Sequence, residues 1–270
     1  MGQASDSLYF GPYRLVRPLA GSALAERWLA LHERKLSSHV VHRFSPCVDK
    51  ASQRRMLAAI ELGQRLSGPH LLPIELFSLS INQQPCAVTP YTGNHEGLLT
   101  LLGLLEAKGG RMSAPEAERA MRHLLEAARH AHGVGQVHGE IGWDDVQVDR
   151  HGSCAIEFYG LGRRLGLVMG PTAELRRDEV RSIVEMGYRL VTGLSPDEPR
   201  IAPTRLNKRL DSSWDEYFEL GLNAAGGFES ASDALDALPS SSRERERQQT
   251  GGTVRVVLSK FGWAGTQRAD

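Results

Sequence analysis

The sequence predicts an α+β fold with two lobes, a small β-rich N-terminal lobe and a mainly helical C-terminal lobe. Short apolar runs separated by polar turns fill the first third of the chain, as expected for strands. Apolar residues recur at helical spacing through most of the remainder. The lobes are expected at about residues 8–91 and 95–238, followed by a polar linker and a short strand-like tail over residues 239–270.

The N-terminal lobe begins with three short β runs, at residues 9–16, 27–31 and 39–44, which predict an antiparallel meander. Residues 50–66 carry apolar side chains near helical spacing and predict one helix. Two further apolar runs, residues 71–74 and 86–89, flank a polar turn and are typical of a hairpin.

The C-terminal lobe should consist mostly of helices. Ser113 is followed by Glu116 at the spacing of a capping box, which predicts the start of a long helix ending near residue 132. Gly193 is placed to stop a second long helix, over residues 178–192. Three shorter helices are expected at residues 98–105, 214–223 and 230–238, and short β runs lie within residues 137–160.

The composition limits the class of protein. Net charge is +0, with 32 basic and 32 acidic residues, so no broad basic field favours nucleic acid. The three cysteines are far apart and odd in number, which is typical of a reducing compartment. No apolar run approaches the ~20 residues that span a bilayer, and the N-terminus lacks an apolar signal core. We therefore expect a cytoplasmic protein without a membrane span.

Residues 137–149, VHGEIGWDDVQVD, have the frame of the sequence H-R-D-L-x-x-x-N. His138 keeps its place and Gly139 stands where the Arg belongs. Glu140 replaces the Asp, and Asp145 replaces the Asn. The spacing of the motif is retained while most of its reactive groups have changed.

With this loop, the layout resembles a bacterial Ser/Thr protein kinase domain over about residues 8–238. Four other segments resemble that family in order and spacing: YRLV with Leu19 and WLA near residues 13–30, GPHLLPI at 68–74, YGLGR at 159–163 and YRLVTG at 188–193. Each motif alone is weak, but together they favour a two-lobed protein-kinase-like fold.

The resemblance places a nucleotide cleft in which the expected residues are changed. The phosphate loop G-x-G-x-x-G aligns with Ala20, Ser22 and Ala25, which lack the glycines that let backbone amides approach phosphates. Thr89 and Tyr91, where the β-rich part ends, are placed along the same cleft. The plainer interpretation of residues 20–25 is an ordinary hairpin turn.

Two charged partners of the family also change. Arg43 aligns with the strand lysine, and its planar guanidinium does not substitute for a compact ammonium. The helix glutamate that should pair with it aligns with Ala59. Glu61 lies two residues further on and faces elsewhere on the helix.

The remaining catalytic positions keep some oxygen atoms. Glu140 occupies the base position and still carries a carboxylate. The loop lysine is replaced by Gly142, and Asp145 retains oxygens that Mg²⁺ accepts. The metal-binding Asp of D-F-G aligns with Phe158, which offers no ligand, unless a one-residue bulge brings Glu157 into that role.

The segment after Gly160 is shorter than the activation loop and substrate platform of the family, with only a Thr-Ala-Glu remnant at residues 172–174.

Together, the changes at these positions predict a pseudokinase, a regulatory or scaffolding module that binds protein partners, needs no cofactor and transfers no phosphate. The alternative is an atypical active Ser/Thr kinase that uses ATP with Mg²⁺ through Arg43, Glu140, Asp145 and Glu157. A third state binds nucleotide without metal or turnover.

Overall fold

The structure is a computed structural model that describes residues 8–93, 97, 99–197, 199–223 and 226–239. The chain divides after Leu238 into two units. Of the linker and strand-like tail predicted for residues 239–270, residues 240–270 lie outside the described residues. No helix in the described part of the first unit is long and apolar enough to cross a membrane.

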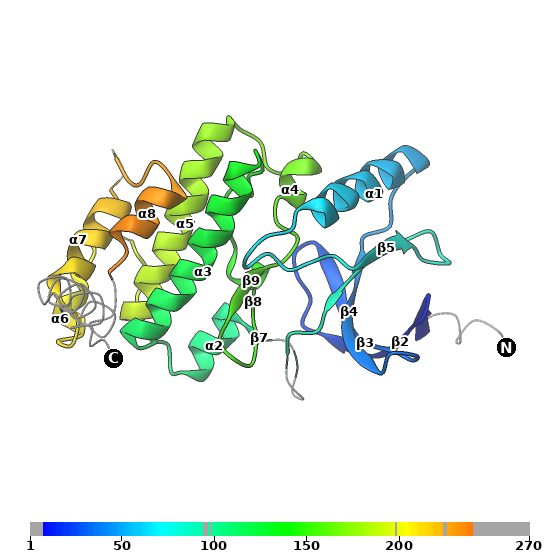
Figure 1. Cartoon of the computed structure of the whole chain (residues 1–270), viewed down its shortest axis with the longest axis horizontal. Helices are drawn as coiled ribbons and strands as arrows, with labels where there is room; N and C mark the ends of the chain where they lie inside the picture. Colours follow the sequence, from blue (N-terminus) through cyan, green and yellow to red (C-terminus); the bar gives the residue numbers. More distant parts are fainter. Residues whose placement is uncertain (1–7, 94–96, 98, 198, 224–225, 240–270) are drawn as a thin grey trace, which may run out of the picture. The chain divides into compact units, whose positions relative to one another are not determined.

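A six-stranded antiparallel sheet forms the N-terminal part, in the order β1-β2-β3-β4-β6-β5 (Figure 1). Its strands are Tyr9–Phe10, Tyr13–Leu19, Ala25–His32, Ser37–Phe44, Leu76–Leu79 and Pro85–Pro90, numbered β1 to β6. The predicted meander is confirmed as β2-β3-β4. The expected hairpin partner of β6 at residues 71–74 is wrong, because β5 takes that place and Leu71 forms only an isolated bridge to Ile156.

Helix α1, Lys50–Arg65, confirms the helix predicted in this part and begins at Asp49, whose side chain accepts a hydrogen bond from the Ser52 amide. The helix packs against one face of the sheet around the buried residues Phe44, Ile60 and Ala87. The opposite face carries a separate apolar cluster that includes Tyr13 and Val41. Because side chains alternate along a strand, neighbouring residues of β4 belong to different faces.

A small antiparallel sheet, β7-β8-β9, follows at the start of the helical part. Its strands are Leu99–Thr100, Val146–Val148 and Cys154–Ile156. Helix α2, Leu101–Ala107, begins directly after β7, so the helix expected from residue 98 starts later than predicted. Helix α3, Ala114–Gly133, has the predicted capping box, in which Glu116 binds back to Ser113.

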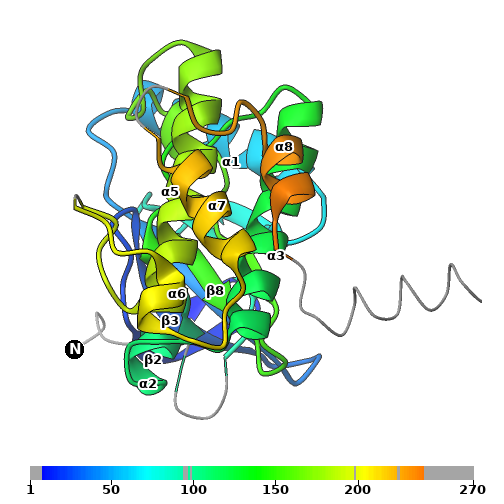
Figure 2. The ribbon, with the colours of Figure 1, turned by 90° about the vertical axis from the view of Figure 1, so that its left-hand side faces the viewer.

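The main apolar core lies among the helices of the C-terminal part, where α3 contacts both α5 and α8 (Figure 2). These helices, numbered α4 to α8, are Leu161–Arg164, Thr172–Thr192, Pro203–Leu206, Ser212–Gly221 and Ala231–Ala237. Helix α5 begins six residues earlier than the predicted start at residue 178. The Thr-Ala-Glu sequence at residues 172–174 is therefore the first turn of a helix, directly after Pro171.

Candidate functional site

A buried arginine makes most of the polar contacts described here between the six-stranded sheet and the segment that follows β9. Arg27 lies on β3 and is only 2% exposed. Its Nη1 donates to the carbonyls of Ala20 and Gly21 at 3.3 and 3.1 Å, and its Nη2 donates to the Asp144 carbonyl at 3.0 Å. Arg27 thus connects the β2–β3 hairpin to the loop before β8.

The charge of Arg27 is neutralised by Glu157, the residue after β9. Nη2 and Nε of Arg27 lie 2.6 and 3.1 Å from Oε2 of Glu157, and both side chains are almost completely buried. Burial raises the pKa of Glu157, while the charge and hydrogen bonds of Arg27 oppose this shift. Neither side chain reaches water, so each buried charge is stabilised mainly by the opposite charge of the other.

His42 is the third polar member of this cluster. It lies opposite Arg27 in the β3–β4 register, and its Nε2 is 3.6 Å from Glu157 and 2.9 Å from Thr89 Oγ1. Burial, and then the positive charge of Arg27, hold the pKa of His42 well below its usual value. The imidazole is therefore neutral, and its Nδ1 has no hydrogen-bond partner among the described residues.

The structure corrects the predicted position of Arg43. Its guanidinium carbon lies 5.3 Å from the ring centre of Trp28, on the sheet face opposite to His42. The residue of β4 that faces Arg27 and Glu157 is His42, one position earlier. A shift of one residue along a strand exchanges its two faces. The sequence alignment, which placed Arg43 at the position of the strand lysine, is therefore displaced by one residue from His42.

Phe158 occupies the apolar side of the same region. It is 3% exposed and belongs to the cluster that contains Ala59 and Phe44. Its ring contacts His42 edge to face, with ring centres 4.6 Å apart. Its φ of +47° is unusual for a bulky side chain, so the packing around it overcomes a backbone cost.

The β2–β3 turn is closed by its own hydrogen bonds. Ser22 Oγ accepts from the Ala25 amide at 3.2 Å, and the Ser22 amide donates to the Ala25 carbonyl at 3.0 Å. Ala25 is buried and Ala20 is exposed. The carbonyls of Ala20 and Gly21 point to Arg27, so this turn presents acceptors to an internal cation. Its arrangement fits a hairpin turn, the plainer interpretation of the sequence.

Thr89 and Tyr91 differ in how closely they belong to this cluster. Thr89 is fully buried and binds His42. Tyr91 lies just beyond β6 and is partly exposed, and burial raises the pKa of its phenol while Arg17 opposes the shift. Of the two positions, Thr89 makes the contact that completes the His42 environment.

A second buried carboxylate, Glu179 of α5, holds the loop at residues 137–142. It is 0% exposed, and its Oε2 accepts from the amides of His138 and Gly139 at 2.8 and 3.4 Å. Its Oε1 accepts from the Tyr159 hydroxyl at 2.5 Å. Burial, and then the Glu179 carboxylate, raise the pKa of Tyr159 far above its ordinary value, so Tyr159 remains a donor.

Two glycines in this loop have structural roles. Gly139 has φ +92°, and a Cβ there would lie 3.0 Å from Val168, so a larger residue does not fit without change. A Cβ at Gly142 would lie 2.8 Å from Asp145 Oδ2. The Gly142 amide instead donates to that oxygen at 2.9 Å. Asp145, a predicted metal ligand, therefore closes its own turn.

Glu140 is the only predicted site residue at an open surface of this loop. It is exposed and lines a cavity of about 460 Å³ with Trp143 and Arg189, whose guanidinium stacks 5.1 Å from the Trp143 ring. The described residues contain no group of three or more His, Cys, Asp or Glu side chains arranged to hold a metal ion. The predicted metal positions Asp145 and Glu157 are each engaged within the protein.

A second arginine connects helix α1 to the helical part. Arg164 of α4 donates to the carbonyls of Ala59 and Tyr159 at 2.9 and 2.7 Å, and to Gln136 Oε1 at 3.1 Å. The sequence resemblance assigns position 59 to a helix carboxylate, but the residue there is Ala59. Its backbone carbonyl accepts the hydrogen bond from Arg164. Only seven residues, 165–171, separate α4 from α5.

Sequence reasoning missed Arg27, His42 and Glu179. Arg27 and His42 carried a readable signal, because both are polar residues in strands whose alternate positions are apolar. Glu179 stands one turn before Ile183 in the apolar stripe of α5, where a carboxylate needs buried donors.

Comparison with known proteins confirms the fold. Crystal structures of the kinase domain of PknI from Mycobacterium tuberculosis match the chain, and one double mutant has a TM-score of 0.66 at 17% sequence identity, covering 87% of this chain and 97% of that one. A second double mutant and a single mutant give TM-scores of 0.65 at 18% identity, covering 88% of this chain and 98% of theirs. No protein-family profile and no curated protein sequence matches. The chain has a protein-kinase-like fold.

Proposed function

We propose that the protein is a pseudokinase, a regulatory or scaffolding module that binds protein partners and transfers no phosphate. The observation that carries the proposal is the buried Arg27–Glu157 pair. A nucleotide site of this fold needs a cation free to meet phosphates and a carboxylate free to hold Mg²⁺. Here the cation that binds the β2–β3 turn, Arg27, is itself paired with a carboxylate, Glu157.

The energetics of the pair favour this assignment. Separating a buried ion pair by removing one partner costs about 3–5 kcal/mol, because the other charge stays buried and uncompensated. A phosphate that recruited Arg27 would leave Glu157 in that state, and a Mg²⁺ ion that recruited Glu157 would leave Arg27 there. His42 adds no positive charge, since its imidazole is neutral.

The segment between α4 and α5 gives independent support. Residues 165–171 are too few to form a loop with a platform for a peptide acceptor, and α5 begins directly after them. Val168 also packs against Gly139, so this short segment covers part of the catalytic-loop frame. A protein that binds a partner elsewhere on its surface needs neither a platform for a peptide acceptor nor an open catalytic loop.

The alternative, an atypical active Ser/Thr kinase, would depend on Glu140, which keeps an exposed carboxylate beside a cavity. It would also need Arg43 on phosphate and Asp145 with Glu157 on Mg²⁺. Arg43 lies on the opposite face of β4, and Asp145 and Glu157 are both engaged. Catalysis would therefore require rearrangement of three residues.

Thermal melting with nucleotide tests the proposal. The full chain should melt at the same temperature with buffer, millimolar ATP, and millimolar ATP with Mg²⁺. A ligand present at 100 times its Kd stabilises a fold by about 2.7 kcal/mol, so a bound nucleotide would be readily detected. Stabilisation by ATP alone would establish the third state, nucleotide binding without metal.

A phosphotransfer assay completes the test. Labelled ATP with a panel of protein acceptors should give no labelled product. Transfer that is lost in Glu140→Gln would overturn the pseudokinase assignment. A matched control, Glu106→Gln, changes an exposed carboxylate on α2 and should have no effect in either assay.

A further inference from the structure

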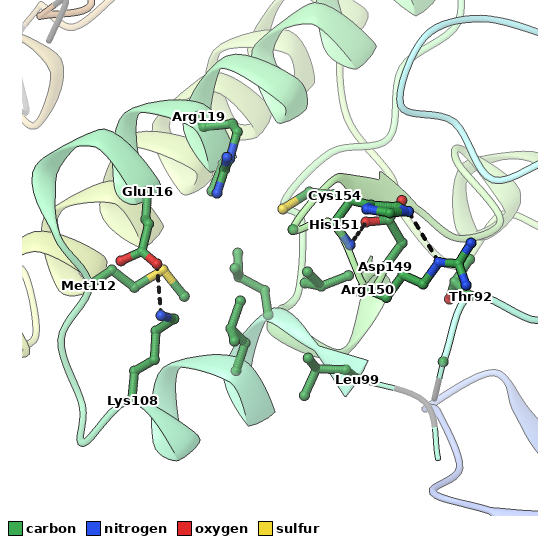
Figure 3. A pocket seen from close by; sticks show the side chains of 16 residues that line it. Thr92, Leu99, Lys108, Met112, Glu116, Arg119, Asp149, Arg150, His151 and Cys154 are labelled. Carbon is green, nitrogen blue, oxygen red and sulfur yellow. Dashed lines mark hydrogen bonds and ion pairs between the residues drawn. The ribbon is translucent and has the colours of Figure 1, made fainter. Parts of the chain in front are cut away.

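A second cavity, of about 440 Å³, lies away from the Arg27–Glu157 pair, between helices α2 and α3 and the β8–β9 turn (Figure 3). Sixteen residues line it. Its volume falls within the roughly 300–1,000 Å³ that small-molecule sites occupy. None of the predicted site residues belongs to this cavity, so it is a separate feature of the fold.

One side of the cavity is apolar. Its lining includes Leu99 and Leu104, which are half-buried and pack on the main core, together with Met112 and Val148, which are buried in that core. A ligand with an apolar body would cover Leu99 and Leu104 and exclude water from their surfaces. Removing this apolar surface from water favours binding, in proportion to the area that is covered.

The rim of the cavity carries a cation, Arg119, that has no partner among the residues that the structure describes. Arg119 extends from α3 toward the hollow, and it makes no hydrogen bond or ion pair with any described residue (Figure 3). Lys108, by contrast, is paired with Glu116 at 2.7 Å. The Asp149 carboxylate accepts from the amides of His151 and Ser153, so it is engaged in its own turn.

The remaining polar groups do not neutralise Arg119. Arg150 donates from Nε to His151 at 3.1 Å and adds a second positive charge to the rim. The Lys108–Glu116 pair is internally balanced. Among the described residues that line the cavity, Arg119 and Arg150 then face one further carboxylate, that of Asp149. The charge of the cavity therefore complements an anion, placed next to an apolar surface.

We propose that this cavity binds a small amphipathic anion, an alkyl or aryl carboxylate whose charged end meets Arg119 and whose apolar body lies on Leu99 and Leu104. The inference goes beyond the proposed function and holds whether or not the protein transfers phosphate. Arg119 suits the role, since a guanidinium offers a planar fork of donors to a carboxylate.

The binding is non-covalent. Cys154 also lines the cavity, but it is only 1% exposed, and burial raises the pKa of its thiol to about 12. A thiol in that state has almost no thiolate at neutral pH and is a poor nucleophile. The selectivity of the site comes from charge and apolar area.

Decanoate titration of the full chain tests this inference. The six methionines can be labelled with ¹³C-methyl groups, and the Met112 resonance is identified by its loss in Met112→Leu. Decanoate should shift the Met112 signal in a saturable way. Decan-1-ol should bind more weakly, and the decyltrimethylammonium cation should leave the signal unchanged, because Arg119 and Arg150 repel it.

Two arginine variants on the same helix provide a matched pair. Arg119→Gln should weaken decanoate binding about tenfold or more, the loss expected for a hydrogen bond to a charged group. Arg129→Gln should leave the affinity unchanged, because Arg129 is also exposed and has no partner among the described residues but lies ~15 Å further along α3. Leu104→Gln should weaken binding through the apolar side.

Three results would overturn the proposal. The first is an unshifted Met112 signal with decanoate, and the second is equal loss of affinity in Arg119→Gln and Arg129→Gln. The third is tighter binding of the tripeptide acetyl-Leu-Leu-Glu than of decanoate, which would reassign the cavity to a protein segment. Circular dichroism of each variant separates loss of binding from loss of fold.

Discussion

The region around Arg27 and the loop held by Glu179, residues 137–142, are stabilised by different kinds of interaction. At the loop, a buried carboxylate binds the amides of His138 and Gly139, so the backbone path is fixed without any reactive side chain. Around Arg27, the buried cation and the Glu157 carboxylate bind each other. The comparison indicates that backbone geometry and site chemistry are separable, because different interactions maintain them.

The two regions also differ in how they use burial. Glu179 accepts from two amides and the Tyr159 hydroxyl, and Nε2 of His132 lies 3.3 Å from its Oε2. Glu157 depends on one opposite charge, Arg27, and on the nearby neutral His42. Several donors share the Glu179 carboxylate and keep the loop in place, whereas Arg27 and Glu157 are neutralised mainly by each other.

Loss of the loop anchor should have the largest effect on stability. Glu179→Leu leaves the His138 and Gly139 amides and the Tyr159 hydroxyl without their acceptor, and each buried unsatisfied donor costs about 1–3 kcal/mol. We expect a loss of about 5 kcal/mol in the free energy of unfolding, measured by urea denaturation. Glu185→Leu on the same helix, where the carboxylate is partly exposed, should cost far less.

The Arg27–Glu157 pair should show strong coupling between its two members. Arg27→Met alone should cost about 4 kcal/mol in unfolding free energy, since it leaves the Glu157 charge buried and unpaired. The double variant Arg27→Met with Glu157→Leu should recover most of this loss, because apolar side chains of similar volume replace both charges. If the double variant lost as much unfolding free energy as the two single variants added together, Arg27 and Glu157 would not be energetically coupled.

The sequence was sufficient to predict the two-lobed fold. The prediction depends on patterns that survive substitution, namely the order of strand-like and helical segments and the spacing of short motifs such as the one around His138. The capping box of Ser113 and Glu116 was also predictable, because it depends on a local contact between neighbouring residues.

The contacts among Arg27, His42 and Glu157 were not predictable, because they depend on which face of its strand each residue occupies. The run VVHRF at residues 40–44 has no lysine to fix its register, and a shift by one residue exchanges His42 for Arg43. The partner of Arg27 is 130 residues away in sequence. Only the packing of β3 against the segment after β9 brings Arg27 and Glu157 together.

Acid should weaken the Arg27 region through His42. The pKa of this imidazole is lower in the folded protein than its ordinary value of 6.5, so below pH 6.5 the unfolded chain binds a proton that the folded chain does not. Stability therefore falls as pH falls, by up to about 1.4 kcal/mol per pH unit from this residue. Unfolding free energies at pH 7.0 and 5.5 measure the effect.

The variant His42→Gln isolates this contribution. Glu157 titrates with the opposite sign, because its folded pKa is raised and protonation favours the folded state as pH falls. That term is present in both proteins, so the difference between them reports His42. The variant should lose less stability than the wild type between pH 7.0 and 5.5, and equal losses would contradict the assignment of a neutral buried imidazole.

The smallest effect is expected at Glu140, the residue that the sequence resemblance predicts at the catalytic-base position. Its side chain is exposed and makes no hydrogen bond to any described residue, so Glu140→Gln should change the unfolding free energy by less than about 0.5 kcal/mol. A loss of several kcal/mol would show that Glu140 supports the loop as Glu179 does. Near-neutrality would instead mean that the loop geometry does not depend on the Glu140 side chain, because the Glu179 carboxylate binds the backbone amides of this loop.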